Sequence, residues 1–459
     1  MFEDTIAAIA TPIGAAGIGI VRISGKDALT IAEKVFQSKN KKRLLEIRHY
    51  TMIYGHIIDK NKGIVDEVLV SVMLGPHSFT AENVIEINCH GGVVAVRKIL
   101  EVVLDAGARL AEPGEFSKRA FLNGRIDLAQ AESIIDLINA KTDKSLQVAI
   151  NQLEGKLSGQ IKLINGELLG LIAQIEAGID FPEHDIEKLS RAQIANKTEE
   201  LLQQINRMID SADTGRVFRE GLKTVIIGKP NVGKSSLLNA LLKEKRAIVT
   251  DIPGTTRDVI EVIINIKGIP LKLVDTAGIR ETDDIVEKIG VEKTKEASEE
   301  ADLILLMIDA STGITENDLQ LLPLIKGKKS LIIFNKIDLK ENFAFPDSTQ
   351  FLGEYEFVET SLVNGQGLLQ LENKIENLVY TGMVISHNDL MVTNVRHKNS
   401  LVRAAESLTN TLSAIQGQLP TDCFAIDLKS AWEALGEITG ETVGEDLVDQ
   451  IFSRFCIGK

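Results

Sequence analysis

The sequence has few of the residues that would indicate a disulfide-stabilised, zinc-binding or membrane-spanning protein. Its 459 residues include three cysteines, Cys89, Cys423 and Cys456, which are too few and too scattered for a disulfide framework or a four-ligand zinc site. No run of about 18 uninterrupted apolar residues occurs, so no membrane span is predicted. The apolar N-terminus starts with Glu3 and Asp4 and is broken by proline and glycine, unlike a secretory signal. We therefore expect a cytoplasmic, reducing environment.

The chain also lacks a surplus of basic residues. It has 51 Lys and Arg against 65 Asp and Glu, a net charge of −14. This balance argues against a generally basic nucleic-acid binder that neutralises many phosphates. Residues 1 to 120 are nearly neutral, with 15 basic and 14 acidic side chains. A nucleic-acid substrate would therefore be held by a limited local surface or by a partner protein.

The patterns along the chain predict a multidomain protein that combines α/β and all-α parts. Short β-branched runs alternate with amphipathic helical patterns over residues 1–118, and helical periodicity dominates residues 119–220. Strand and helix alternate again over 221–379, and 380–459 is helical. This order predicts an N-terminal α/β domain and one helical domain with an inserted Ras-like α/β domain. Two separate helical domains are the alternative.

A phosphate-binding loop begins directly after an apolar strand. The strand Lys223–Ile227 leads into Gly-Lys-Pro-Asn-Val-Gly-Lys-Ser at 228–235 and then into helix-forming residues. In this context the glycines let backbone N–H groups converge on phosphates at a helix N-terminus. Lys234 is expected to reach the β and γ phosphates, and the Ser235 hydroxyl to bind Mg²⁺.

The remaining nucleotide motifs occur in the order of a GTPase. Asp275 to Gly278 follow a predicted strand, where the carboxylate can hold magnesium through water and the Gly278 N–H can sense the γ phosphate. Asp338 of an Asn-Lys-Ile-Asp motif can accept from guanine N1–H and the exocyclic amine, a donor pair that adenine lacks. Thr256 lies in a Gly-Thr-Thr switch and can complete the magnesium shell.

The GTP-binding residues predicted from these motifs are Asn231, Val232, Gly233, Lys234, Ser235, Ser236, Thr250, Thr255, Thr256, Asp275, Thr276, Ala277, Gly278, Asn335, Lys336, Asp338 and Ser361.

The residue that positions water in many GTPases is replaced by Ile279. The polar segment that follows, from Arg280 to Glu287, supplies candidate catalytic side chains, although an exposed acidic switch loop explains the same pattern. The side-chain oxygen of Asn231 could hold a monovalent cation near the β and γ phosphates, with backbone oxygens of 250–255 completing the shell.

Several segments outside these motifs resemble one family, the tRNA-modification GTPases called MnmE or TrmE. They include Asp4–Pro12, Gly19–Gly25, Pro113–Ser117, Asp127–Glu132 and the C-terminal Cys456–Lys459. The resemblance covers the whole chain. It implies a homodimer joined through folate-binding N-terminal domains, with a central helical domain that carries the inserted GTPase.

The resemblance also implies an activity and a partner. Together with the FAD protein MnmG, in a heterotetramer, such a protein adds an aminomethyl or carboxymethylaminomethyl group at C5 of the wobble uridine of tRNA. The carbon comes from 5-formyl- or methylene-tetrahydrofolate. Arg22, Glu82, Arg125 and Lys459 are the implied folate contacts, although Arg125 stands where other members have Lys.

For hydrolysis, the resemblance places K⁺ on Asn231, Thr250, Ile252 and Thr255, and Mg²⁺ on Ser235 and Thr256. It assigns Glu287, with Arg280 nearby, to orienting the attacking water, and it makes Cys456 important for tRNA modification as a nucleophile or as a structural neighbour of the folate. Cys423, in an apolar helical context, is expected to be an inert buried thiol, and His90 to be a satisfied residue of a close turn.

A ribosome-assembly GTPase switch of the Era or Der type is the alternative function, because its GTPase motifs would look much the same. No Gly-x-x-Gly loop in a basic domain supports it.

Overall fold

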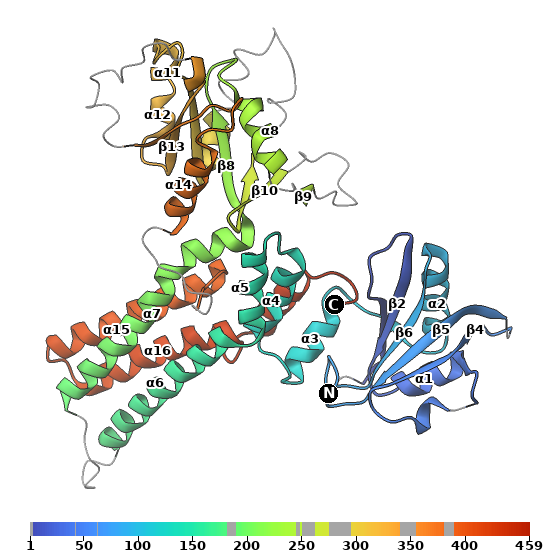
Figure 1. Cartoon of the computed structure of the whole chain (residues 1–459). Helices are drawn as coiled ribbons and strands as arrows, with labels where there is room; N and C mark the ends of the chain where they lie inside the picture. The colour runs from blue at the N-terminus through green and yellow to red at the C-terminus, as the bar shows by residue number, and fades with distance from the viewer. Residues whose placement is uncertain are drawn as a thin grey trace. The chain divides into compact units, whose positions relative to one another are not determined.

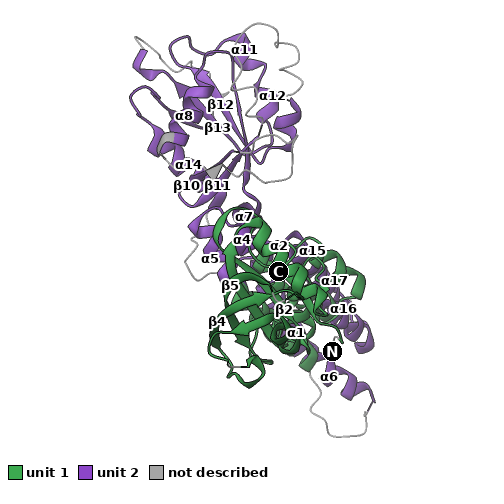
Figure 2. Cartoon of the chain, turned by 90° about the vertical axis from the view of Figure 1, so that its right-hand side faces the viewer, with its two compact units in different colours: residues 1–135, 153–170, 432–459 green, residues 136–152, 171–431 purple. Residues whose placement is uncertain are grey.

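The computed structural model (Figure 1) describes residues 3–41, 43–61, 63–180, 190–244, 248–249, 262–274, 295–339, 355–380 and 390–459. The chain forms two compact units, which Figure 2 shows in different colours. Unit 1 contains residues 1–135, 153–170 and 432–459, and unit 2 contains residues 136–152 and 171–431. Each unit therefore combines segments that are far apart in the sequence.

Unit 1 contains a seven-stranded sheet with the strand order β3-β4-β5-β6-β2-β1-β7. Neighbouring strands run antiparallel except for β1 and β7, which are parallel. The strands are β1 (Ile6–Ile9), β2 (Ala16–Ser24), β3 (Phe36–Ser38), β4 (Thr51–Ile58), β5 (Ile64–Met73), β6 (Val84–Gly91) and β7 (Arg109–Leu110).

Helices α1 (Ala28–Val35) and α2 (Val93–Asp105) pack against one face of this sheet. The alternation along the strands gives that face its core, because Ile53, Val70 and Ile87 all point into it. The side chains that alternate with these along each strand point to the opposite face. There Met52 is 58% exposed and Leu69 is 43% exposed, so part of the second face is accessible in the described chain.

A helical layer in unit 1 joins the two ends of the chain. It is formed by α3 (Glu115–Leu122), α4 (Leu128–Asn139) and α17 (Glu445–Phe452). Their apolar side chains share one core, in which Phe452 lies 6.2 Å from Phe121 between ring centroids. This core fixes the start of the C-terminal tail, which follows α17 directly.

Unit 2 contains a second seven-stranded sheet, in the order β14-β13-β12-β8-β11-β10-β9. The five strands from β14 to β11 are parallel, and β10 and β9 are antiparallel additions at one edge. The strands are β8 (Leu222–Ile227), β9 (Ile248–Val249), β10 (Val262–Ile266), β11 (Ile269–Leu273), β12 (Leu303–Asp309), β13 (Ser330–Asn335) and β14 (Glu356–Glu359).

The central strands of this sheet are apolar on both faces. Along β12, Leu305 contributes to one core and Leu306 to the other, and β8 and β13 alternate in the same way. Continuous burial is expected for parallel strands that are covered by helices on both sides. Among the described helices, α8 (Lys234–Glu244) and α14 (Leu368–Tyr380) contribute to one core and α12 (Leu322–Ile325) to the other. The short helix α11 (Glu316–Leu319) precedes α12.

Long helices from both sides of the α/β segment pack together in unit 2. Helix α7 (Arg191–Glu220) lies along α15 (Val395–Gln416). A capping box starts α7, where Ser190 Oγ accepts from the Gln193 N–H at 3.2 Å and Gln193 Oε1 accepts from the Ser190 N–H at 2.8 Å. The fold class predicted from the sequence, α/β parts with a helical region that the Ras-like segment interrupts, is thus confirmed.

The helical region differs from its sequence pattern at one point. A continuous helical periodicity runs from Leu146 to Ile179, but the structure divides it into α5 (Asp143–Leu153) and α6 (Lys156–Asp180). The break lies at Gly155, whose φ of 83° is incompatible with a helix. Other helical segments among the described residues are α16 (Thr421–Thr439), residues 295–300, and the short 3₁₀ helices at Leu44–Glu46 and Ile337–Leu339. Of the described helices, none is both long and apolar enough to cross a membrane.

Candidate functional sites

The phosphate-binding loop lies between β8 and α8, as its sequence predicts. Three of its residues have positive φ, namely Gly228 at 148°, Asn231 at 62° and Gly233 at 106°. Glycine adopts such angles freely, and asparagine tolerates the left-handed region better than most residues. A Cβ atom on Gly233 would lie 2.4 Å from Asn335 Nδ2, so a side chain there would displace the neighbouring motif.

The side chain of Lys234 is held by hydrogen bonds to carbonyl oxygens of the phosphate-binding loop. Its Nζ donates to the carbonyl oxygens of Gly228 and Lys229, both at 2.7 Å. Burial lowers the pKa of Lys234. The ammonium group is therefore fixed at the centre of the loop, where the convergent N–H groups make the site attractive to phosphate.

The base-recognition motif contacts the phosphate loop directly. Asn335, the last residue of β13, donates from Nδ2 to the Val232 carbonyl oxygen at 2.9 Å. The Ser361 hydroxyl donates to Asp338 Oδ1 at 2.6 Å. Asn335 thus joins the two motifs, and Ser361 orients the carboxylate that we expect to read guanine.

Lys336 of the same motif pairs with an acid at the end of β12. Its Nζ lies 2.6 Å from Asp309 Oδ2, and the N–H and hydroxyl of Ser311 both donate to Asp309 Oδ1. Burial acts to raise the pKa of Asp309, but the hydrogen bonds from Lys336 and Ser311 outweigh it and the pKa lies below its ordinary value. Asp309 is therefore a charged partner of Lys336.

The structure therefore brings together the described part of the predicted GTP site. Residues 231–236 lie on the loop and the start of α8, and their loop contacts the motif that contains Asn335, Lys336 and Asp338. The other predicted residues lie outside the described residues, namely Thr250, Ile252, Thr255, Thr256, Asp275, Thr276, Ala277, Gly278, Arg280 and Glu287.

A second group of predicted residues gathers in unit 1, around Arg22. The Nε of Arg22 lies 2.8 Å from Glu86 Oε1, and its Nη1 donates to the Gly458 carbonyl oxygen at 3.1 Å. Arg22 and Glu86 face each other in the register of β2 and β6. The guanidinium thus joins the sheet to the C-terminal tail, which lies more than 430 residues away in sequence.

The tail is fitted closely to the N-terminal strands. Gly458 has φ of 92°, and a Cβ atom there would lie 2.2 Å from the carbonyl oxygen of Ile9. The Gly114 N–H donates to the Cys456 carbonyl oxygen at 3.4 Å, and the Lys459 N–H donates to the same oxygen at 3.3 Å. Only glycine fits the position of Gly458 without displacing the tail.

Two arginines flank the ring of Phe79. The guanidinium carbon of Arg22 is 5.6 Å from the ring centroid, and that of Arg125 is 5.1 Å away. Arg125 also donates from Nη1 to the Phe79 carbonyl oxygen at 3.1 Å. Arg22 and Arg125 therefore both lie beside one aromatic side chain, and Arg22 also contacts the C-terminal tail at Gly458.

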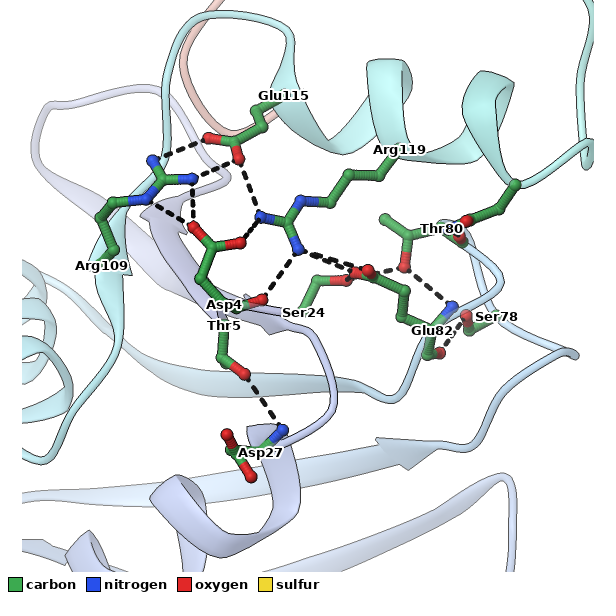
Figure 3. Close-up of polar contacts among 11 residues, drawn as sticks. Asp4, Thr5, Ser24, Asp27, Ser78, Thr80, Glu82, Arg109, Glu115 and Arg119 are labelled. Carbon is green, nitrogen blue, oxygen red and sulfur yellow. Dashed lines mark hydrogen bonds and ion pairs between the residues drawn. The ribbon is translucent and has the colours of Figure 1, made fainter. Parts of the chain in front are cut away.

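Glu82 occupies a different environment, inside a network of buried charges (Figure 3). Its Oε2 accepts from the Ser24 hydroxyl at 2.7 Å, and its Oε1 lies 3.2 Å from Nη1 of Arg119. Arg119 is fully buried and also pairs with Asp4 at 2.7 Å and with Glu115 at 2.9 Å. The Glu82 carboxylate is thus engaged within the fold.

Glu86 is a residue that the sequence reasoning missed. It lies on β6, four residues after Glu82, which precedes the strand; it faces Arg22 in the register with β2 and is 22% exposed. The alternation of β6 gives the signal, because Glu86 interrupts a run of buried apolar residues at a position opposite Arg22. A carboxylate there needs either an ion-pair partner or a ligand.

The three thiols differ in exposure. Cys456 is exposed, and Cys89 is buried, where burial raises the pKa of its thiol to about 11. The expectation that Cys423 is buried is wrong, because it is only half-buried; its helix α16 lies partly at the surface. Cys456 is the most accessible nucleophile of the three.

His90 has a structural partner, as expected, but on a strand rather than in a turn. Its ring Nδ1 lies 2.7 Å from Asp66 Oδ1, and its N–H donates to Asp66 Oδ2 at 2.9 Å. The hydrogen bond with Asp66 raises the pKa of His90. The ring is mostly exposed, so this pair belongs to the surface of the sheet.

The geometry of unit 2 defines a class of protein. A parallel sheet carries a P-loop after β8 and an Asn-Lys-x-Asp motif after β13, and a side-chain amide joins the two motifs. This arrangement is that of a P-loop GTPase domain.

Comparisons with known proteins extend this class to a family. The family model described as "GTP-binding protein TrmE N-terminus" matches residues 5–125, and that described as "MnmE helical domain" matches residues 128–456. The chain belongs to the MnmE family of tRNA modification GTPases.

Similarity to individual relatives extends over the full length. The tRNA modification GTPase MnmE of Alkaliphilus metalliredigens is 56% identical over 458 residues, which are 100% of this chain and 99% of that protein. The MnmE proteins of Desulforamulus reducens and Clostridioides difficile are 55% and 53% identical, and each alignment covers 100% of this chain and at least 99% of the relative.

Among solved structures, Aquifex aeolicus Era bound to GDP·AlF4⁻ is 32% identical, with 40% of this chain and 66% of that chain covered and a TM-score of 0.28. At that score, the likeness does not bear on the fold.

Proposed function

We propose that this chain is the GTP-hydrolysing component of a complex that modifies the wobble uridine of tRNA. In this proposal it acts with the FAD protein MnmG to add an aminomethyl or carboxymethylaminomethyl group at C5. The position of the C-terminal tail carries the proposal, because Arg22 binds the Gly458 carbonyl oxygen at 3.1 Å. Exposed Cys456 lies two residues before Gly458 in the same tail, which supports a role for it near the proposed folate contacts.

The nucleotide site supports GTP binding through two sets of contacts. Lys234 lies on the loop carbonyls of Gly228 and Lys229, where it can also reach the phosphates of a bound nucleotide. Asp338 is held by Ser361, so its carboxylate is oriented before the base arrives. Hydrolysis is assigned to Glu287, with Arg280, as the group that orients water.

The described residues fit the metal ions of this proposal in part. Ser235 at the start of α8 would hold Mg²⁺, together with Thr256. Asn231 would hold K⁺, together with Thr250, Ile252 and Thr255. The left-handed backbone of Asn231, at φ of 62°, is observed in the described loop. The two cations would neutralise charge that develops on the phosphates.

The residues around Phe79 fit a tetrahydrofolate in their chemistry. Its pterin ring can stack on aromatic and guanidinium planes, its amidine can donate to a carboxylate, and its glutamate tail can bind cations. Arg22, Arg125 and Lys459 supply the positive charges, and the two guanidinium groups supply planar surfaces for stacking. Glu86 supplies an accessible carboxylate, whereas Glu82 would need to exchange partners with Arg119. When bound, the folate supplies the one-carbon unit.

Cys456 and the homodimer complete the proposal. Cys456 is exposed, as a nucleophile or as a neighbour of the folate would require, and it belongs to the tail that Arg22 contacts at Gly458. The accessible face of the unit 1 sheet, with Met52 and Leu69, supports association of two N-terminal domains. MnmG and tRNA are the proposed partners.

The decisive experiment compares tRNA nucleosides, by mass spectrometry, from cells with and without this protein. The proposal predicts that the C5-modified wobble uridine disappears without the protein and returns with the intact gene, but not with a Lys234→Ala variant. An unchanged wobble uridine together with a defect in ribosomal subunits would instead establish the Era or Der type of function.

A further inference from the structure

The phosphate loop contains a second lysine whose side chain leaves the nucleotide site. Lys229 Nζ lies 2.7 Å from Asp318 Oδ2 and donates to Thr315 Oγ1 at 2.8 Å. Asp318 is 1% exposed and Lys229 is 18% exposed. The pair is therefore a buried charge contact between the phosphate loop and the segment that starts α11.

Asp318 is held in place by Thr315 as well as by Lys229. The N–H of Thr315 donates to Asp318 Oδ2 at 2.9 Å as one half of the capping box of α11, and the Thr315 hydroxyl donates to the same oxygen at 2.9 Å. In the described part of the chain, no second cation lies within ion-pair distance of Asp318. Because a buried carboxylate is costly without a counter-charge, Asp318 requires Lys229 in its observed position.

The same stretch of chain also holds the base-recognition motif. Asp309 at the end of β12 pairs with Lys336 at 2.6 Å. Residues 309–318, which we call the brace segment, thus carry one acid for a lysine of the phosphate motif and another for a lysine of the base motif. The two ends of a bound GTP would be recognised by motifs that are tied to one short segment.

The phosphate loop needs such external support. Three of its residues have positive φ, and its N–H groups must converge before the ligand arrives if binding is not to lose affinity to loop ordering. Asn335 fixes the loop at Val232, and Lys234 fixes the carbonyls of Gly228 and Lys229 from inside. Lys229 supplies the anchor from outside, at the residue whose carbonyl holds Lys234.

We infer that Lys229 and Asp318 are positioning residues for GTP: the ion pair between them holds the phosphate loop in its binding-ready shape and ties it to the brace segment. The inference rests on the proposed GTPase function. Because the pair supports the loop rather than the γ phosphate, it stabilises GDP and GTP binding equally and leaves the hydrolysis step unchanged.

A double-mutant cycle on the full chain tests this inference. The variants are Lys229→Met, Asp318→Asn and both together, where the side-chain oxygen of Asn can still accept from the Thr315 N–H. We expect each single variant to raise the Kd for fluorescent GDP and for a GTP analogue about tenfold. The double variant should bind no more weakly than either single variant, since both remove one contact. The kcat at saturating GTP should stay within about twofold of the wild-type value.

Two controls separate positioning from general stability. Lys229→Arg keeps the charge and should restore affinity to within about threefold of wild type. Lys374→Met removes an exposed pair with Glu356, 3.0 Å apart on the same domain, and should leave the Kd unchanged. Circular dichroism at the assay temperature verifies that each variant is folded.

Several outcomes would overturn the inference: an unchanged Kd in the single variants, additive losses in the double variant, or a fall in kcat at constant affinity. A wild-type chain that neither binds nor hydrolyses GTP would overturn the proposed function itself. Wild-type activity with full affinity in Lys229→Met would overturn only the positioning role.

Discussion

The nucleotide site and the site around Arg22 are built in opposite ways. At the nucleotide site, Lys234 is held by carbonyl oxygens five and six residues away, within one continuous motif. Around Arg22, the partners are Glu86 on another strand and Gly458 in the tail. The first site can therefore be predicted from a contiguous sequence motif. The second is formed by residues that come together only when the sheet and the tail fold.

This difference extends to what stabilises each site. The phosphate loop depends on backbone geometry and a few hydrogen bonds, so its residues are replaceable only within narrow conformational limits. The site in unit 1 lies next to a buried guanidinium, Arg119, that serves three carboxylates. We therefore expect variants of unit 1 to lose stability before they lose binding, and variants of the loop to do the reverse.

The largest effect is expected for Arg119→Met, which removes the buried cation of Glu82 and leaves Asp4 and Glu115 with Arg109 alone (Figure 3). Removing one partner of a buried ion pair costs about 3–5 kcal/mol. Hydrogen exchange of β1 and α3 should report this loss locally. Arg109→Met is the comparison, because Arg109 is 43% exposed and its loss leaves Asp4 and Glu115 paired with Arg119, so it should cost less than Arg119→Met. Equal protection in both variants would contradict the central role of Arg119.

Lys234→Ala should produce the opposite result. Loss of charge-assisted hydrogen bonds to the phosphates should weaken GTP binding by about 3 kcal/mol, roughly 100-fold. The stability of unit 2 should change little, because the ammonium contacts only loop carbonyls. Nucleotide titration and thermal unfolding measure the two effects. If Lys234→Ala lowered the unfolding temperature but kept its affinity for GTP, the nucleotide site would not differ from the unit 1 site in the way proposed.

A smaller effect should show which carboxylate faces a folate. Glu86→Gln keeps the size of the side chain but removes the charge beside Arg22, and should weaken folate binding by about tenfold. Glu82→Gln should mainly lower stability, since its partner is buried Arg119. Calorimetry with 5-formyltetrahydrofolate compares the two variants. The reverse ranking would establish Glu82 as the folate contact that its sequence position predicts.

The smallest effect is a dependence of unit 1 on acid. Burial acts to raise the pKa of Glu115, but hydrogen bonds from Arg109, the Glu112 backbone and Arg119 outweigh it, so the pKa lies below its ordinary value. A lowered folded pKa contributes stability above the unfolded value, and that stability is lost as the pH falls through the folded pKa. Urea unfolding from pH 6 to pH 3 should therefore show a loss of stability below about pH 4.5. If the Glu115→Gln variant lost as much stability as the wild-type chain over this pH range, the acid sensitivity would come from other carboxylates.

The sequence predicts the two sites to different extents. The strand, loop and helix around Lys234 follow from contiguous residue types, and the order of later motifs predicts a GTPase. The sequence alone does not show that Glu86, and not Glu82, is the partner of Arg22. Both are acids near one strand, and only the register with β2 distinguishes them. Lys229 was likewise hidden, since its partner Asp318 lies 89 positions further along the chain. Long-range ion pairs leave no local pattern.

The fit of Gly458 against the Ile9 carbonyl oxygen has a practical consequence. Because the tail is seated on strand β1 and bound by Arg22, a carboxypeptidase can remove residues only when that contact opens. The rate of C-terminal trimming therefore measures how often the tail detaches from Arg22 and strand β1. Trimming reports the seating of the tail separately from the pairing of the strands beneath it.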